Sequence, residues 1–370
     1  MPNKDRHFMQ MALELAARAA GRTSPNPMVG AVVVRNGQVV GRGYHAKAGT
    51  PHAEVHALRE AGELARGATM YVTLEPCCHR GRTGPCTEAI IQAGIKRVVM
   101  AMTDPNPLVA GKGMQILQDS GLQVECGLMA EEARRLNEFF IKYITTGMPF
   151  VALKTAMSLD GKIATAAGES KWITGPEARE YVHRLRDRYD AVLVGIGTVL
   201  ADNPSLTTRL PEGAGRDPVR VIVDSRARTP VNSRVLTQSS AAPTIIAVLP
   251  EAPPERVHVL RQAGAEIITV PGSGGMVDLR NLMRELARRE ITSLLVEGGA
   301  RVNGSLVLGN LVDKVYWFIA PLLIGGSAAP SPVGGEGAAS LRDALPVEKI
   351  TWQRFGKDIC LEGYVQRRGD

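Results

Sequence analysis

The sequence predicts an α/β protein of two domains, and three observations support this expectation. Short β-rich runs alternate with helix-like segments along the 370 residues. That length favours two domains, each large enough for a hydrophobic core of its own. A boundary is indicated near 143–149, because after a helix-like segment at 131–141 the polar stretch 145–149 breaks the pattern and ends in a proline. We therefore expect one domain at residues 1–146 and a second at residues 147–370.

The first domain is expected to be layered, with helices packed against a sheet. Asn36-Gly37 separates two β-branched runs and predicts a type I′ hairpin turn. The expected helices cover residues 8–20, 54–65 and 87–93, and the expected strands cover 31–34, 39–40, 68–74 and 97–102.

The second domain is expected to contain a mixed sheet. The expected strands are 150–156, 191–194, 219–223, 244–248, 266–270, 292–296, 315–324 and 359–365, and helices are expected at 176–187 and 277–289. The stretch 325–340 is rich in Gly, Ala, Ser and Pro, which predicts a flexible surface loop.

The most informative motif is His52-Ala53-Glu54, followed by a loop that contains Cys77 and Cys86. One imidazole and two thiols suit zinc, whose fourth position then stays open for water. Zinc lowers the pKa of such a water to about 7. A carboxylate two residues after the histidine can move protons, as in the zinc-deaminase signature. The two cysteines are separated by residues 78–85, whereas that signature places only two residues between them.

Other interpretations of this motif compete with a catalytic zinc site. A structural zinc site would need a fourth ligand, which Cys78 or His79 could supply. His56 lies one helical turn after His52, but a zinc protease needs glutamate directly after the first histidine, and Ala53 stands there. Buried cysteines are often simply small apolar side chains. Five cysteines in 370 residues do not make a disulfide framework.

Composition restricts the compartment and the partners. No apolar run approaches about 18 residues and no secretory segment is visible, so we expect a cytoplasmic protein that does not enter a membrane. The net charge of +7 comes from dispersed basic residues interleaved with acids, and aromatic residues are few. This pattern favours a phosphorylated small molecule over nucleic acid as the partner.

The second half contains weaker signals for ligand binding. Residues 195–198 (Gly-Ile-Gly-Thr) follow a strand and could hold a phosphate, although a plain tight turn explains them equally well. Residues 297–305 place glycines between a buried strand and a helix start, where free backbone amides bind anions. Lys154 and Glu297 are charged residues at the ends of apolar strands, where solvated strand termini are common.

Over essentially its whole length, the chain resembles the family of bifunctional riboflavin-biosynthesis deaminase–reductases. The matching blocks of the first half are residues 23–30, 43–45, 52–54, the cysteine loop and 104–107. Those of the second half are residues 154–164, 169–175, 193–209 and 296–299. The resemblance implies a cytidine-deaminase-like three-layer domain followed by a dihydrofolate-reductase-like domain.

For the first domain, the resemblance implies that His52, Cys77 and Cys86 bind zinc and that Glu54 is the proton shuttle. Cys78 stands where the family commonly has serine, which makes it a bystander, and Gly84 replaces a usual proline. The implied substrate-binding residues are Asn26, His45, His79, Arg82 and Asn106.

For the second domain, the resemblance implies binding of NADPH and of a phosphorylated substrate. The implied cofactor-binding residues are Ala156, Trp172, Thr198, Asp202, Ser225, Gly299, Ala300, Arg301, Val302, Asn303, Gly304 and Ser305. The implied substrate-binding residues are Ser170, Arg186, Leu206, Arg209 and Glu297. Arginine suits the substrate's phosphate because its guanidinium can bind two oxygens at once. Lys154 and Glu297 are the candidates for assisting proton movement.

The implied chemistry has two steps. Zinc-activated hydroxide replaces an amine on 2,5-diamino-6-ribosylamino-4(3H)-pyrimidinone 5′-phosphate, and NADPH then reduces the ribosyl group to ribityl. A homo-oligomer is also expected. The main alternative is a tRNA base deaminase with an accessory domain, which would predict the short cysteine spacing and a basic, aromatic groove. A non-catalytic RNA-binding relative would have lost Glu54 or a zinc ligand, and a chain with only one active domain is a further alternative.

Overall fold

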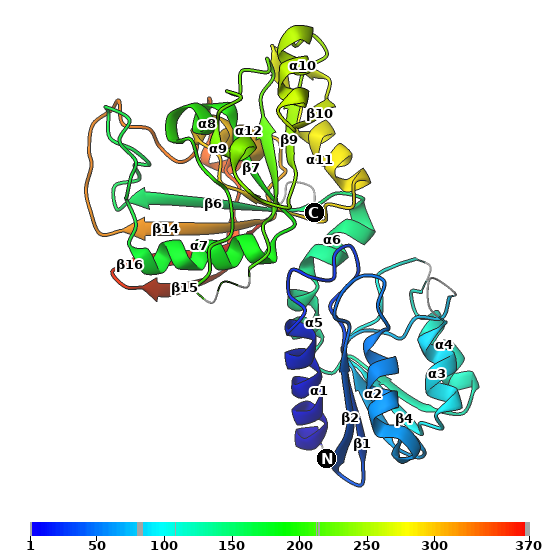
Figure 1. The fold of residues 1–370 in the computed structure, drawn as a ribbon. Coiled ribbons are helices and arrows are strands. Elements are labelled where there is room, and N and C mark those ends of the chain that lie inside the picture. The colour runs from blue at the N-terminus through cyan, green and yellow to red at the C-terminus, as the bar shows by residue number, and fades with distance from the viewer. Residues whose placement is uncertain (1, 80–83, 108, 212, 214, 367–370) are drawn as a thin grey trace. The chain divides into compact units, whose positions relative to one another are not determined.

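The chain folds into two compact units, Met1–Met148 and Pro149–Asp370 (Figure 1). The computed structural model describes residues 2–79, 84–107, 109–211, 213 and 215–366. Within these ranges, no helix is both long and apolar enough to cross a membrane.

The N-terminal unit is built around one mixed sheet with the strand order β2-β1-β3-β4-β5. Its strands are β1 (Gly30–Arg35), β2 (Gln38–Tyr44), β3 (Thr69–Val72), β4 (Arg97–Met100) and β5 (Gln123–Cys126). Its helices are α1 (Pro2–Ala17), α2 (Ala53–Ala61), α3 (Cys86–Gln92), α4 (Lys112–Asp119), α5 (Ala130–Leu136) and α6 (Glu138–Thr146). Strand β1 is antiparallel to both β2 and β3, whereas β3, β4 and β5 are parallel.

Helices α1 and α2 cover opposite faces of this sheet, and two glycines let them come close. A Cβ on Gly30 would lie 2.0 Å from the carbonyl oxygen of Ala12 in α1, and one on Gly43 would lie 2.1 Å from that of Ala53 in α2. Gly43 pairs with Ala31, the neighbour of Gly30, so the two glycines face opposite sides. The contact with β2 holds the start of α2 against the sheet.

The hairpin prediction is confirmed, while two helix predictions need correction. Asn36 and Gly37 have φ values of 51° and 78°, as a type I′ turn requires. The helix expected over 54–65 ends at Ala61 and continues as a short 3-10 turn. The helix expected over 131–141 is divided between α5 and α6 at Asn137. The side chain of this residue accepts a hydrogen bond from the Met28 amide (2.7 Å) and donates one to the Met28 carbonyl (2.9 Å).

The C-terminal unit contains a nine-stranded sheet with the order β10-β9-β8-β7-β13-β6-β14-β16-β15. Its strands are β6 (Phe150–Ser158), β7 (Ala191–Gly195), β8 (Val219–Val223), β9 (Thr244–Val248), β10 (Glu266–Thr269), β13 (Ser293–Val296), β14 (Lys314–Ala320), β15 (Val347–Phe355) and β16 (Asp358–Val365), with β11 (Gly272–Ser273) and β12 (Met276–Val277) as a separate small hairpin. Its helices are α7 (Pro176–Arg188), α8 (Ile196–Asp202), α9 (Arg234–Thr237), α10 (Pro254–Gln262), α11 (Leu279–Arg288) and α12 (Ala300–Leu308). The expected mixed sheet is confirmed. In sheet order, the strands β10, β9, β8, β7, β13, β6 and β14 are parallel to their neighbours, whereas β16 is antiparallel to both β14 and β15.

The segment 325–340 is a largely exposed loop, as its composition predicts, but hydrogen bonds hold its middle in place. The amide of Gly334 donates to the carbonyl of Ala300 at 2.9 Å, and the side chain of Asn303 donates to the carbonyl of Pro332 at 2.8 Å. These hydrogen bonds hold the middle of the segment against α12. The segment therefore packs against the helix that follows β13.

Candidate active sites

In the N-terminal unit, one imidazole nitrogen and two sulfur atoms converge. His52 Nδ1 lies 3.2 Å from the Sγ of Cys86 and 3.5 Å from the Sγ of Cys77, and the three ligand atoms all lie within 4.8 Å of one another. His52 precedes α2 as its N-cap residue, Cys86 is the first residue of α3, and Cys77 lies in the loop after β3. This donor set fits a tetrahedral zinc ion with one position left for a small ligand.

The electrostatics of this cluster also suit a metal. Hydrogen bonds from Cys86 and His52 lower the pKa of the Cys77 thiol to about 4, which favours the thiolate that binds metal. Cys78 is partly buried and lies outside the cluster, and burial raises the pKa of its thiol. The geometry thus separates two neighbouring cysteines, one in the cluster and one beside it.

Glu54 lies in the first turn of α2, next to the cluster. Its side chain is buried, and this burial raises the pKa of the carboxyl to about 7. A carboxyl that titrates near neutral pH can both accept and release a proton there.

His45 and Asn26 form a second polar group beside the metal ligands. His45 Nε2 lies 3.2 Å from Asn26 Nδ2, and His45 Nδ1 lies 3.3 Å from the carbonyl oxygen of Pro51. Only the tautomer with its proton on Nδ1 satisfies both partners. The His45 ring meets the His52 ring edge-on, with centroids 5.3 Å apart, and burial lowers the pKa of His45. His45 is therefore a neutral side chain at the edge of the cluster.

Glu75 organises the loop that carries Asn106, and sequence reasoning missed it. Its carboxylate accepts three backbone hydrogen bonds, from Asp104 (3.1 Å), Gly111 (2.9 Å) and Met114 (3.0 Å). The signal was a carboxylate directly after the buried run 68–74, where a loop begins. Of the other residues expected to bind substrate, His79 is exposed and Arg82 lies outside the described residues.

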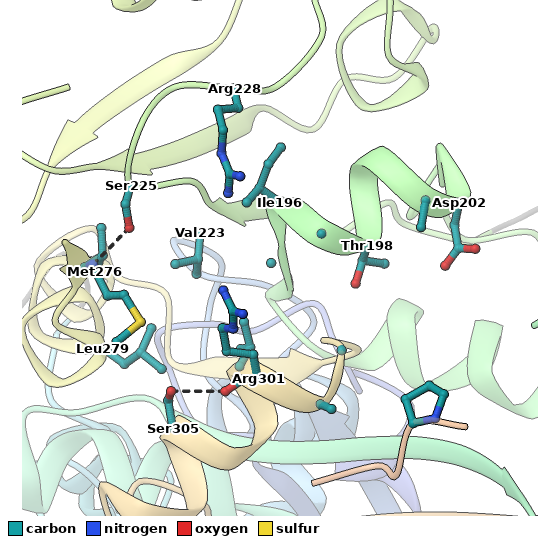
Figure 2. A pocket seen from close by; sticks show the side chains of 18 of the residues that line it. Ile196, Thr198, Asp202, Val223, Ser225, Arg228, Met276, Leu279, Arg301 and Ser305 are labelled. Carbon is teal, nitrogen blue, oxygen red and sulfur yellow. Dashed lines mark hydrogen bonds between the residues drawn. The ribbon is translucent and has the colours of Figure 1, made fainter. Parts of the chain in front are cut away.

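In the C-terminal unit, two adjoining cavities lie at the carboxyl ends of the parallel strands, where α/β sheets bind ligands. The larger cavity has a volume of about 880 Å³ and is bordered by residues that follow β7, β8 and β13 (Figure 2). The smaller has a volume of about 790 Å³ and contains Lys154 and Glu297 in its wall. The residues shared by both walls are Ile163, Ser170, Thr198 and Asp202.

Most of the residues expected to bind the cofactor line one of these cavities. The larger is lined by Thr198, Asp202, Ser225, Gly299, Ala300, Arg301, Val302 and Ser305, and the smaller by Ala156, Trp172, Thr198 and Asp202. Asn303 and Gly304 lie instead against the segment 325–340. The Asn303 side chain is buried in its hydrogen bond to Pro332, and a Cβ on Gly304 would lie 1.9 Å from the Gly334 carbonyl oxygen. The structure therefore assigns these two residues to packing rather than to the cavity wall.

Glu297, Arg186 and Lys154 form a buried ionic group in the wall of the smaller cavity. The Nε and Nη2 atoms of Arg186 donate to the two carboxylate oxygens of Glu297 at 2.6 and 3.0 Å. Lys154 Nζ lies 3.6 Å from Glu297 Oε2. Burial opposes the charge on Glu297, but the two cations outweigh it and lower the pKa of Glu297 to about 2. Burial lowers the pKa of Lys154, which makes this ammonium group a readier proton donor.

The other residues expected to bind substrate also line the smaller cavity. Ser170 donates to Asp202 at 3.2 Å. Leu206 is buried and has a φ of 55°, so it contributes to the wall from a left-handed backbone conformation. Arg209 is exposed and donates to the hydroxyl of Thr207 at 2.9 Å. The geometry thus places all five expected side chains of this group around one cavity.

His183 in α7 also lines the smaller cavity and was not expected from the sequence. Its Nδ1 accepts a hydrogen bond from the Arg209 amide at 3.3 Å, which leaves the proton of the neutral ring on Nε2. Burial, together with the charges of Arg186 and Arg209, lowers the pKa of His183 to about 4. His183 is therefore an uncharged donor beside two cations.

This environment predicts a pH dependence of stability. An unfolded histidine titrates near pH 6.5, so below that pH the unfolded chain binds a proton that the folded chain does not bind until about pH 4. The stability associated with neutral His183 is present above pH 6.5 and is lost as the pH falls toward 4. Between pH 7 and pH 5, His183→Gln should lose about 1 kcal/mol less unfolding free energy than the wild type, after allowance for solvent screening.

Urea denaturation followed by tryptophan fluorescence can measure this difference, because all three tryptophans lie in the C-terminal unit. His258→Gln in α10 is a matched control, since His258 is exposed, and it should keep the wild-type slope. A His183→Gln slope equal to that of the wild type would contradict the assignment.

Comparison with known proteins agrees with this division into two sites. Residues 2–102 match the family described as the cytidine and deoxycytidylate deaminase zinc-binding region, and residues 149–361 match the RibD C-terminal domain. The fold and the sites thus define a zinc-binding deaminase joined to a reductase. The chain belongs to the RibD family of riboflavin biosynthesis.

Curated relatives and solved structures cover nearly the whole chain. The riboflavin biosynthesis protein RibD of Bacillus amyloliquefaciens is 46% identical over 96% of this chain and 95% of its own length. The RibD of Escherichia coli K12 is 44% identical over 97% of this chain and 98% of its own length. The structure of Acinetobacter baumannii RibD covers 99% of this chain and 100% of its own, with a TM-score of 0.87 and 39% identity.

These findings confirm the expected α/β class, the family and the two activities. They disfavour the alternative of a tRNA base deaminase with an accessory domain, because the second unit matches the RibD C-terminal domain. The long cysteine spacing is thus compatible with membership of a zinc-binding deaminase family.

Proposed function

We propose that the chain deaminates 2,5-diamino-6-ribosylamino-4(3H)-pyrimidinone 5′-phosphate and then reduces the ribosyl group of the product to ribityl with NADPH. A Thermotoga maritima relative, 39% identical with a TM-score of 0.86, is titled a diaminohydroxyphosphoribosylaminopyrimidine deaminase and 5-amino-6-(5-phosphoribosylamino)uracil reductase. The observation that carries the proposal is the His52, Cys77 and Cys86 cluster with Glu54 in one unit, joined to a two-cavity site in the other.

In the N-terminal unit, His52, Cys77 and Cys86 are the proposed ligands of zinc. When bound, the metal supplies Lewis-acid activation of water at neutral pH. Glu54, buried in the first turn of α2 next to these ligands, would be placed to carry a proton from such a water to the departing amine.

The pyrimidine is held beside the zinc ligands by polar side chains. Neutral His45 uses both ring nitrogens on Asn26 and Pro51, so it fixes Asn26, whose amide presents defined hydrogen-bonding groups to a ring. We assign Asn106, His79 and Arg82 to the same task, the first on the loop that Glu75 organises.

In the C-terminal unit, NADPH is proposed to lie in the larger cavity and the ribosyl phosphate in the smaller. The two cavities meet at Ser170, Thr198 and Asp202, so a nicotinamide at this junction can reach the sugar. NADPH bound there would supply the hydride that C1′ needs. The reduction also needs one proton, which Lys154 is placed to donate, and ionised Glu297 holds Lys154 in place.

The substrate's phosphate needs cations that the internal network has not already engaged. Arg186 is committed through three donors, two to Glu297 and one to the Thr207 carbonyl at 3.0 Å. Arg186 therefore shapes the site chiefly through Glu297. Arg209 is more accessible, and His183 adds a neutral donor beside it. We assign the phosphate mainly to this pair.

Two assays test the proposal separately. The zinc-loaded chain should release ammonia from the diaminopyrimidine substrate with no nicotinamide cofactor present. The deaminated product should then support NADPH oxidation, seen as loss of near-ultraviolet absorbance. Absence of ammonia release would refute the deaminase assignment, and absence of NADPH oxidation with authentic deaminated product would refute the reductase assignment.

The cysteine cluster predicts which thiols hold the metal. Cys77→Ser should lower bound zinc from about one ion per chain to near zero after dialysis against a weak chelator, because it removes one of three ligands. Cys78→Ser, at the adjacent position, should retain zinc and ammonia release. Elemental analysis of both variants decides the point. Loss of zinc from Cys78→Ser would instead indicate a site with four protein ligands.

A further inference from the structure

Glu75 lies at a junction between the sheet of the N-terminal unit and the metal-binding cluster. It is buried in the loop that follows β3, and its backbone amide donates to the carbonyl of Met102, just after β4, at 3.0 Å. Two residues later in the same loop is Cys77, a member of the metal-binding cluster. The chain around Glu75 therefore connects two neighbouring strands to a metal ligand.

The carboxylate of Glu75 caps helix α4 from outside the helix. The first amides of an α-helix have no partner within it, and Gly111, the N-cap residue of α4, has no side chain to supply one. Glu75 Oε2 accepts a hydrogen bond from the Gly111 amide at 2.9 Å, and Oε1 accepts one from the Met114 amide at 3.0 Å. A carboxylate at this end also suits the helix dipole. Glu75 thus replaces the missing capping side chain of α4.

The same carboxylate holds the loop that leads from β4 into α4. Glu75 Oε2 also accepts a hydrogen bond from the Asp104 amide at 3.1 Å, and Asp104 Oδ1 accepts one from the Asn106 amide at 2.8 Å. Asp104 and Glu75 are both buried. Two successive hydrogen bonds therefore link Asn106 to the residue that stands two positions before Cys77.

Close packing holds α4 against the metal-binding loop as well. A Cβ on Gly113 would lie 2.2 Å from the carbonyl oxygen of Pro76 and 3.2 Å from Glu75 Oε1. Because Pro76 stands between Glu75 and Cys77, the first turn of α4 touches the metal-binding loop directly. The loop between β4 and α4 is thus fixed at both of its ends relative to Cys77.

We propose that Glu75 is a positioning residue for deamination, because it fixes Asn106 relative to the metal ligands. Glu75 does not touch the pyrimidine in this role, and it acts through Asn106. A misplacement of about 1 Å in a site can lower a rate by up to about 10²-fold, so a rigid link between the two loops matters. The inference rests on the proposed deaminase function, in which Asn106 helps to hold the pyrimidine.

A double-mutant cycle with the full-length, zinc-loaded chain tests whether Glu75 acts through Asn106. Glu75→Gln keeps the size of the side chain but replaces one acceptor oxygen by a group that only donates, opposite backbone donors. Glu75→Gln and Asn106→Ala should each lower kcat/KM for ammonia release about tenfold. The double variant should also lose about tenfold, whereas independent residues would together lose about 100-fold.

Two controls make the cycle specific to this loop. Asn26 is held by His45, outside the loop between β4 and α4, so the effects of Asn26→Ala and Glu75→Gln should multiply. Glu60→Gln changes an exposed carboxylate that also accepts a backbone hydrogen bond, from Arg42 at 2.9 Å, and it should keep the wild-type kcat/KM. Elemental analysis should find about one zinc ion per chain in every variant.

Gly113→Ala provides a second route if Glu75→Gln does not fold. It displaces α4 from the metal-binding loop without changing Glu75, and its effect should likewise fail to multiply with that of Asn106→Ala. Effects of Glu75→Gln and Asn106→Ala that multiply, Asn106→Ala at the wild-type kcat/KM, or loss of zinc from Glu75→Gln would each overturn the inference and leave the deaminase function intact. A wild type that releases no ammonia would overturn the proposed deaminase function and this inference with it.

Discussion

Replacing Glu54 with glutamine is expected to lower the rate of ammonia release by about 10³-fold. Glu54 is buried next to the three metal ligands, and its pKa of about 7 allows it to accept and return a proton near neutral pH. Glutamine keeps the shape of the side chain but cannot transfer a proton in this way. Initial rates of ammonia release, measured at saturating substrate and equal zinc content, give the effect on kcat.

Two comparisons make this result specific. Glu63→Gln changes an exposed glutamate that follows α2, and it should leave ammonia release unchanged. Glu54→Gln itself should keep about one zinc ion per chain and should still reduce authentic deaminated product with NADPH. A Glu54→Gln rate within about tenfold of the wild type, with zinc bound, would assign the proton transfer to another group.

Replacing Glu297 with glutamine is expected to damage both the stability and the reductase activity of the C-terminal unit. The change leaves Arg186 and Lys154 as buried cations without a counter-charge. Breaking such a buried pair costs about 3 kcal/mol of unfolding free energy. We also expect NADPH-dependent reduction to fall at least about 10²-fold, because Lys154 is no longer held in place. Urea denaturation followed by tryptophan fluorescence and single-turnover reduction measure the two effects.

A surface control and a double variant distinguish the effect of the buried charges on stability from the effect of Lys154 placement on reduction. Glu285→Gln removes a carboxylate that pairs with Arg288 and Arg289 on the surface of α11, and it should cost less than about 1 kcal/mol. Adding Lys154→Met to Glu297→Gln removes one of the stranded cations, so it should recover part of the stability without recovering reduction. If Glu297→Gln reduces substrate at the wild-type rate, Glu297 has only a structural role.

The fold was largely predictable where burial and turn chemistry leave a local signal. The Asn36-Gly37 pair is a typical hairpin turn, and strands such as β8 and β9 are continuous apolar runs with clear ends. The structure confirms both predictions. The division of one expected helix at Asn137 was not predictable. Its cause is a pair of hydrogen bonds to Met28, more than 100 residues away in the sequence.

Strand β15 was not predicted from the sequence, because it is exposed rather than buried. Eight of its nine residues are exposed, so its sequence lacks the alternation of buried and exposed positions that marks a half-buried strand. Trp352 is 70% exposed at this edge of the sheet. The strand is defined by its pairing with β16, and this long-range contact leaves no local pattern.

In the candidate sites, too, the residues with a local sequence signal were predictable and those defined by long-range contacts were not. His52, Glu54, Cys77 and Cys86 carry their chemistry in their side-chain types, so the motif predicted the cluster that the structure brings together. Glu75 and His183 are ordinary charged or polar residues in sequence, and only the folded chain shows what they face. Asn303 and Gly304 were expected at the cofactor on resemblance, but the pitch of α12 turns them toward the segment 325–340.

The central claim is that one chain carries out deamination and reduction at two separate sites, in that order. Mass spectrometry of a single reaction mixture tests it most directly, with the diaminopyrimidine substrate, zinc-loaded protein and NADPH either absent or added later. The account predicts that the deaminated ribosyl compound accumulates without NADPH and converts to the ribityl compound once NADPH is added. A ribityl product that still carries the original amine, or ammonia release that requires NADPH, would contradict it.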